Sequence, residues 1–177
     1  MSEVTGFHGT SRQAAEKIIE QGFRPSRNVY DWLGDGIYFF QDGLERARGW
    51  AKQEHGDDGA VLRAKISLDG CMDLLDRRWF SVLSEAHDTV ITLHRRAGLR
   101  LPTQQGGAHG MDRLVINMAA EALSDDGQPI RSVRGIFQEG RPAFPGSALF
   151  DQAHIQIAVR DPAAITTLEL LAADTHD

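Results

Sequence analysis

Strand-like segments lie toward both ends of the chain, and helical segments fill its middle. The strand candidates are 37–40, 60–68, 130–137 and 154–159, and the later helix candidates are 44–53, 77–96 and 111–123. A first helix is expected between a cap at Thr10 or Ser11 and Gly22, which stands where a C-terminal glycine belongs. A regular alternation of strands and helices is typical of a parallel sheet, so this uneven distribution predicts an α+β domain instead.

A chain of 177 residues fits one domain, which we expect to span 1–177 with a flexible glycine-rich loop near 102–111. Its net charge of −6 provides no overall field that would attract nucleic acid or a membrane surface. Cys71 is the only cysteine, which excludes an intrachain disulfide and a four-cysteine zinc site. We find neither a signal-peptide pattern nor the roughly 18-residue apolar run of a membrane helix. These features predict a cytoplasmic protein without a bound metal.

Three short motifs contain the candidate functional residues: GFHGT at 6–10, WLGDGIYFF at 32–40 and HIQIAV at 154–159. Glycine lets a ligand approach the backbone, histidine can hydrogen-bond a hydroxyl group, and tyrosine offers a flat ring with a polar tip. In the third motif, strand alternation places Gln156 on the polar face with His154. Taken singly, each motif also has an ordinary explanation as a turn or as a buried or half-buried strand.

In this order, the motifs resemble those of the ADP-ribosyltransferase superfamily of the diphtheria toxin and poly(ADP-ribose) polymerase type. That family has a His-Tyr-Glu triad, with a histidine in a His-Gly-Thr context and a tyrosine in a Gly-x-Gly-Ile-Tyr-Phe context. His8 and Tyr38 match these two positions. The second and third motifs are also similar to those of a group of uncharacterised bacterial members. The resemblance covers 6–165 and implies an ADP-ribosyltransferase split β-sandwich that holds NAD in a cleft.

The resemblance also implies a role for each matching residue. His8 would hold the adenosine-side ribose, with Thr10 helping to orient it, and the backbone of Gly9 would hold the nicotinamide amide. Tyr38 would stack on the nicotinamide ring. Trp50, on the helix that follows, would cover the other face of that ring. The serine that the family has on this helix is missing from 44–51.

The third triad position falls on Gln156, where the family usually has glutamate. Glutamine can hydrogen-bond a ribose hydroxyl but brings no negative charge to stabilise an oxocarbenium-like transition state. This difference argues against chain elongation and leaves single transfer, in which binding geometry does most of the work. Glu139, at the start of a glycine- and proline-rich loop, is a second carboxylate. It either serves as a base on the acceptor side or is an ordinary solvated turn residue.

The resemblance therefore implies an NAD-dependent mono-ADP-ribosyltransferase, with NAD as substrate and an unidentified protein or nucleic acid as acceptor. By analogy with small bacterial toxins and phage-defence transferases, we expect an antitoxin or inhibitor protein that restrains the activity. Two alternatives stay open. One is an NAD glycohydrolase, in which water is the acceptor. The other is a catalytically silent module that binds NAD or ADP-ribose, and the neutral Gln156 is its main support.

Overall fold

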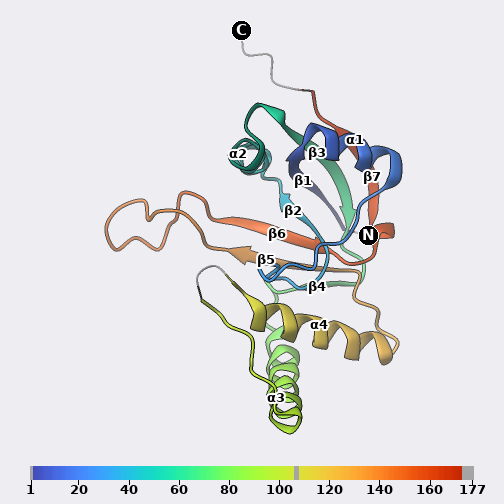
Figure 1. Ribbon diagram of the computed structural model, residues 1–177, viewed down its shortest axis with the longest axis vertical. Helices are drawn as coiled ribbons and strands as arrows, with labels where there is room; N and C mark the ends of the chain where they lie inside the picture. The colour runs from blue at the N-terminus through green and yellow to red at the C-terminus, as the bar shows by residue number, and fades with distance from the viewer. Residues whose placement is uncertain (1, 106–107, 173–177) are drawn as a thin grey trace.

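The computed structural model describes residues 2–105 and 108–172, which form a mixed α+β structure around a seven-stranded sheet (Figure 1). The strands follow the order β4-β5-β6-β2-β1-β3-β7, in which β4 and β5 are parallel and every other pair is antiparallel. The strands are β1 (Glu3–Ser11), β2 (Ile37–Gln41), β3 (Gly59–Ser67), β4 (Cys71–Asp73), β5 (Ser132–Phe137), β6 (His154–Val159) and β7 (Ile165–Leu170). The helices are α1 (Arg12–Gln21), α2 (Leu44–His55), α3 (Trp79–Ala97) and α4 (Gly110–Asp125), with short 3₁₀ turns at Gly56–Asp58 and Pro162–Ala164.

The α+β prediction is confirmed, and so are the predicted helices and strands, to within a few residues at their ends. Ser11 is the N-cap of α1, where its Oγ accepts a hydrogen bond from the Ala14 amide at 3.2 Å, and Gly22 follows the helix end with φ +79°. The strand candidates did not include β1 or the edge strands β4 and β7. Residues 106 and 107 of the expected flexible loop lie outside the described residues, so its flexibility stays a prediction.

Helices α1 and α2 cover opposite faces of the β1–β3 pair. Side chains of β3 alternate between them, because Val61 packs in the cluster of α2 whereas Leu62 packs with Ala15 of α1. Helix α2 lies so close to β1 that a Cβ atom on Gly9 would be 2.4 Å from the Ala47 carbonyl oxygen. Only glycine therefore fits at position 9.

Helices α3 and α4 lie at the other end of the sheet, next to β4 and β5 (Figure 1). The core between them and the sheet includes Met72, Val90, Ile116 and Val133. Leu33, from the loop before β2, is buried in the same core. The segment that leads into β2 is therefore anchored to the α3–α4 half of the molecule. Within the described residues, no helix combines the length and the apolar character needed to cross a lipid bilayer.

The sheet opens between β1 and β2. Strand β1 pairs with β3 along its whole length, but the described pairing with β2 covers just Gly6 with Gln41 and Phe7 with Phe40. His8 is the first residue of β1 beyond this pairing. The divergence of the two strands creates a space inside the sheet that neither α1 nor α2 fills.

Candidate active site

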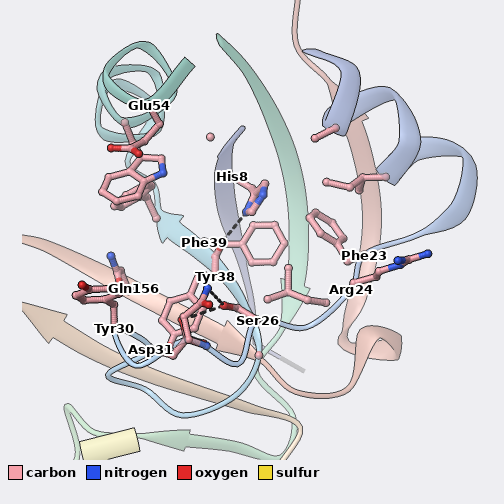
Figure 2. A pocket seen from close by; sticks show the side chains of 18 of the residues that line it. His8, Phe23, Arg24, Ser26, Tyr30, Asp31, Tyr38, Phe39, Glu54 and Gln156 are labelled. Carbon is pink, nitrogen blue, oxygen red and sulfur yellow. Dashed lines mark hydrogen bonds between the residues drawn. The ribbon is translucent and has the colours of Figure 1, made fainter. Parts of the chain in front are cut away.

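A cavity of about 1240 Å³ occupies the space where β1 and β2 diverge (Figure 2). It is larger than the roughly 300–1,000 Å³ of most small-molecule sites. Six of the seven candidate residues line it: His8, Gly9, Tyr38, Trp50, Glu139 and Gln156. Thr10 is not among the described lining residues. The structure thus brings together side chains from β1, β2, α2 and β6, and from the chain just after β5.

His8 is fixed by one hydrogen bond and by two aromatic rings. Its Nδ1 lies 2.8 Å from the carbonyl oxygen of Tyr38, and since a carbonyl only accepts, Nδ1 carries the proton. The ring packs edge-on against Phe23 at 5.2 Å and at an angle to Phe39 at 5.8 Å. Burial lowers the pKa of His8, although the hydrogen bond to Tyr38 acts in the other direction. The neutral ring keeps a lone pair on Nε2, which can accept a hydrogen bond from a ligand hydroxyl.

The hydroxyl group of Tyr38 is engaged inside the protein. It accepts a hydrogen bond from the Leu33 amide at 2.9 Å and donates one to the Gly34 carbonyl at 2.8 Å. Burial raises the pKa of Tyr38, so the hydroxyl stays protonated. Tyr38 is among the residues that line the cavity, and its polar tip closes the turn before β2. Contact of a ligand with the ring, which the family resemblance implies, stays a prediction.

Residues far away in the sequence, which the sequence analysis did not select, hold the same turn in place. Asn117 of α4 donates to the Asp35 carboxylate at 3.0 Å and accepts from the Asp35 amide at 3.0 Å. Arg113 binds the same carboxylate at 2.7 Å, and Arg160 donates to the Asn117 side chain at 2.7 Å. Burial would raise the pKa of Asp35, but the hydrogen bonds from Asn117 and Arg113 outweigh it and hold the pKa below its usual value. Glycine is required at Gly34, where φ is +82°.

Both ends of the Gln156 side-chain amide have protein partners. Trp32 Nε1 donates to Gln156 Oε1 at 2.7 Å, and Gln156 Nε2 lies 2.9 Å from His154 Nε2. His154 Nδ1 in turn lies 2.6 Å from the carbonyl oxygen of Gln152. The expectation that His154 and Gln156 share a face of their strand is confirmed. Trp32, the partner of the amide oxygen, also lines the cavity.

Glu139 forms an ion pair with Arg46 of α2, and both residues line the cavity. The guanidinium of Arg46 also lies over the Phe40 ring, 5.3 Å from its centroid. Glu139 is therefore neither a freely solvated turn residue nor an unattached carboxylate. Trp50, also on α2, lines the cavity with 41% of its surface exposed, so its indole is accessible.

Asp31 is a further carboxylate of the cavity lining that the sequence did not reveal. It is 7% exposed and accepts hydrogen bonds from Ser26 Oγ at 3.0 Å and from the Asn28 amide at 2.5 Å. Burial raises the pKa of Asp31, and these hydrogen bonds partly oppose the rise. Its partners give Asp31 a structural task in the loop before β2. Within 2–105 and 108–172, no group of three or more His, Cys, Asp or Glu side chains is placed to hold a metal ion.

Comparisons with known proteins give little further information. No family model matches the chain. An uncharacterised protein of Methanocaldococcus jannaschii is 35% identical to it over 69 residues, which cover 36% of this chain and 32% of the archaeal protein. The chain thus spans about a third of the length of the curated relative it matches.

Proposed function

We propose that this protein is a mono-ADP-ribosyltransferase with the split β-sandwich of that superfamily, and that NAD binds in the cavity between β1 and β2. One observation carries the proposal. His8, Tyr38 and Gln156 were selected from three separate sequence motifs, and all three line a single cavity at the opening of the sheet. Their meeting at one cavity is what a shared ligand would require.

The geometry supports a role for each residue. The neutral His8 accepts a hydrogen bond from a ribose hydroxyl through Nε2, and the ring of Tyr38 provides a surface for the nicotinamide. Gln156 hydrogen-bonds the nicotinamide-side ribose. In the reaction, the bond between C1′ of this ribose and the nicotinamide nitrogen breaks, and its electron pair leaves with nicotinamide. The acceptor then attacks C1′ and loses its proton.

A second candidate is an NAD glycohydrolase, and the state of Glu139 favours it. The Glu139 carboxylate is engaged in an ion pair with Arg46, so it would have to leave this partner before it could serve as a base for a macromolecular acceptor. Water, by contrast, is small enough to reach C1′ without being docked on the protein or positioned by a base. The two candidates share the cavity and every NAD-binding residue, and they differ in the fate of the ADP-ribose.

One experiment with NAD labelled in its adenine tests both candidate functions. Purified protein is incubated with this NAD and a bacterial lysate freed of small molecules, and nicotinamide release is measured together with label in the protein, RNA and DNA fractions. We expect nicotinamide release with covalently attached label. Release with the label in free ADP-ribose would favour the glycohydrolase, and binding without release would favour the silent module. Absence of NAD binding in calorimetry would overturn the proposal.

Three variants connect this assay to the cavity. His8→Ala should weaken NAD binding about tenfold through loss of a ribose hydrogen bond, whereas His87→Ala on the exposed face of α3 should not. Gln156→Ala should slow both transfer and hydrolysis. Glu139→Gln should slow transfer and spare hydrolysis, and full transfer activity in this variant would remove Glu139 from the acceptor side of the mechanism.

A further inference from the structure

We propose that Trp32 and His154 are positioning residues that fix the Gln156 amide in one orientation, and that they do so only while His154 is neutral. The inference concerns the residue that stands at the third triad position, so its consequence for catalysis rests on the proposed function. Its structural part is independent of NAD.

The direction of each hydrogen bond follows from the chemistry of its partners. The indole Nε1 of Trp32 can only donate, so the atom 2.7 Å away must be the amide oxygen of Gln156. The Gln152 carbonyl can only accept, so His154 carries a proton on Nδ1. The neutral ring then has a lone pair on Nε2, which accepts from Gln156 Nε2–H at 2.9 Å. The chain Trp32, Gln156, His154, Gln152 has one consistent direction throughout.

Packing holds both rings of this chain in place. Trp32 lies 4.9 Å from the Phe137 ring, in space that a glycine leaves open, because a Cβ atom on Gly135 would be 3.0 Å from the indole. The His154 ring packs edge-on against Phe40 at 4.9 Å and Phe137 at 5.6 Å. The amide of Gln156 thus meets two fixed partners. One lone pair on Oε1 and one N–H on Nε2 remain for a ligand.

Protonation of His154 breaks this arrangement. An imidazolium donates from both nitrogens, so Nε2–H of His154 would face the N–H of Gln156. If the amide rotated to offer its oxygen to His154, its NH₂ group would face the indole N–H of Trp32. Either orientation loses one hydrogen bond. Hydrogen-bond donation to the ligand from the amide nitrogen is therefore secured only with neutral His154.

The surroundings of His154 keep it neutral near pH 7. Burial lowers the pKa of His154 most, and the nearby cation of Arg46 lowers it further. The hydrogen bond to Gln152 and the carboxylate of Glu139 act in the opposite direction but do not outweigh them. The amide should lose its fixed orientation as the pH falls through the lowered pKa.

The structural part is tested by nitrogen-15 NMR of the histidine side chains in the protein without NAD. We expect His154 as the Nδ1–H tautomer, with a titration midpoint below that of an ordinary histidine. In Gln156→Glu, the carboxylate can accept from both Trp32 and protonated His154, so this midpoint should rise by about one pH unit or more. An Nε2–H tautomer in the wild type, or an unchanged midpoint in Gln156→Glu, would overturn the proposal.

The catalytic part is tested by the pH profile of nicotinamide release. Trp32→Phe and His154→Phe keep an aromatic ring but remove the hydrogen-bonding nitrogen, so each should slow release about tenfold at neutral pH. His154→Phe should also remove the acidic decline that follows the His154 midpoint in the wild type, whereas Trp32→Phe keeps His154 and should keep that decline. Any decline that follows the His8 resonance should remain in both variants. The control His87→Phe should change neither rate nor profile. If both variants kept the wild-type rate, or if His154→Phe kept the wild-type profile, the positioning role would be wrong.

The two arms separate this inference from the proposed function. If wild-type protein binds NAD but releases no nicotinamide, the proposed transfer reaction is wrong. The NMR titration still tests whether the proposed chain of hydrogen bonds through Gln156 and His154 exists. If nicotinamide is released but Gln156→Glu leaves the His154 midpoint unchanged, the proposed function stands and the positioning of Gln156 does not.

Discussion

The two walls of the cavity are held in place by different forces. On the β1 wall, His8 packs against two phenylalanine rings and Gly9 lies directly under the backbone of α2. On the wall formed by β2 and β6, the polar tips of Tyr38 and Gln156 are tied by hydrogen bonds to residues of other elements. Figure 2 shows His8 and Gln156 on different sides of Tyr38.

This difference predicts two kinds of sensitivity. A packed wall responds to changes in volume, because interiors are dense and backbones cannot move apart freely. A hydrogen-bonded wall responds to removal of single polar atoms, because each lost partner leaves a buried group unsatisfied. The following substitutions test whether the two walls behave in these different ways, and they are ordered from the largest expected effect to the smallest.

Gly9→Ala should have the largest effect. Its Cβ would be 2.4 Å from the Ala47 carbonyl oxygen, so α2 would have to move away from β1 at a cost of about 3 kcal/mol in unfolding free energy. Chemical denaturation measures this loss. The matched control is Gly49→Ala in α2, where nothing lies within 4 Å of the added Cβ; it should stabilise the protein by about 0.5–1 kcal/mol. Equal stability of the two variants would contradict the close packing of the β1 wall.

Asn117→Ala should have the next largest effect, on the opposite wall. It removes the side chain that binds both the amide and the carboxylate of Asp35, at a cost of about 2 kcal/mol. Because the turn carries Tyr38, NAD binding should weaken as well, although Asn117 does not line the cavity. Denaturation and calorimetry measure the two losses. Gln13→Ala, on the exposed side of α1, should change neither.

Tyr38→Phe should have a smaller effect on stability. It removes the hydroxyl that binds Leu33 and Gly34 but keeps the ring, for a loss of about 1 kcal/mol. Tyr30 is the other tyrosine of the chain and is 63% exposed, so Tyr30→Phe is the matched control and should leave stability unchanged. NAD binding should survive in Tyr38→Phe better than in Tyr38→Ala. Equal binding losses would assign the function to the hydroxyl.

The pH dependence of stability should show the smallest effect. Burial lowers the pKa of His8 in the folded protein, so the unfolded chain takes up the proton at a higher pH than the fold does. The contribution of neutral His8 to stability is fully present above the pKa of the unfolded chain and is lost as the pH falls toward the folded pKa. Denaturation of wild type and His8→Gln across this range should give a shallower pH dependence in the variant. Identical slopes would mean that His8 titrates normally.

The sequence predictions were most accurate for structural features that a single short segment determines. Ser11 and Gly22 delimit α1 by capping, which acts within one turn of the helix. The alternation in 154–159 placed His154 and Gln156 on one face, because strand geometry fixes it locally. Edge strands β4 and β7 were missed, since a strand of three residues and one beyond Pro162 carry little pattern of their own.

By itself, then, the sequence determined the α+β character, the four helices, strands β2, β3, β5 and β6, and the motifs around His8, Tyr38 and Gln156. Tertiary structure alone decided what these side chains meet. The partners of the site come from far along the chain: Trp32 reaches Gln156 across 124 positions, Asn117 reaches Asp35 across 82, and Arg46 reaches Glu139 across 93. The physical reason is that propensity and periodicity act over a few residues, whereas these contacts depend on the order of the strands and on the divergence of β1 from β2.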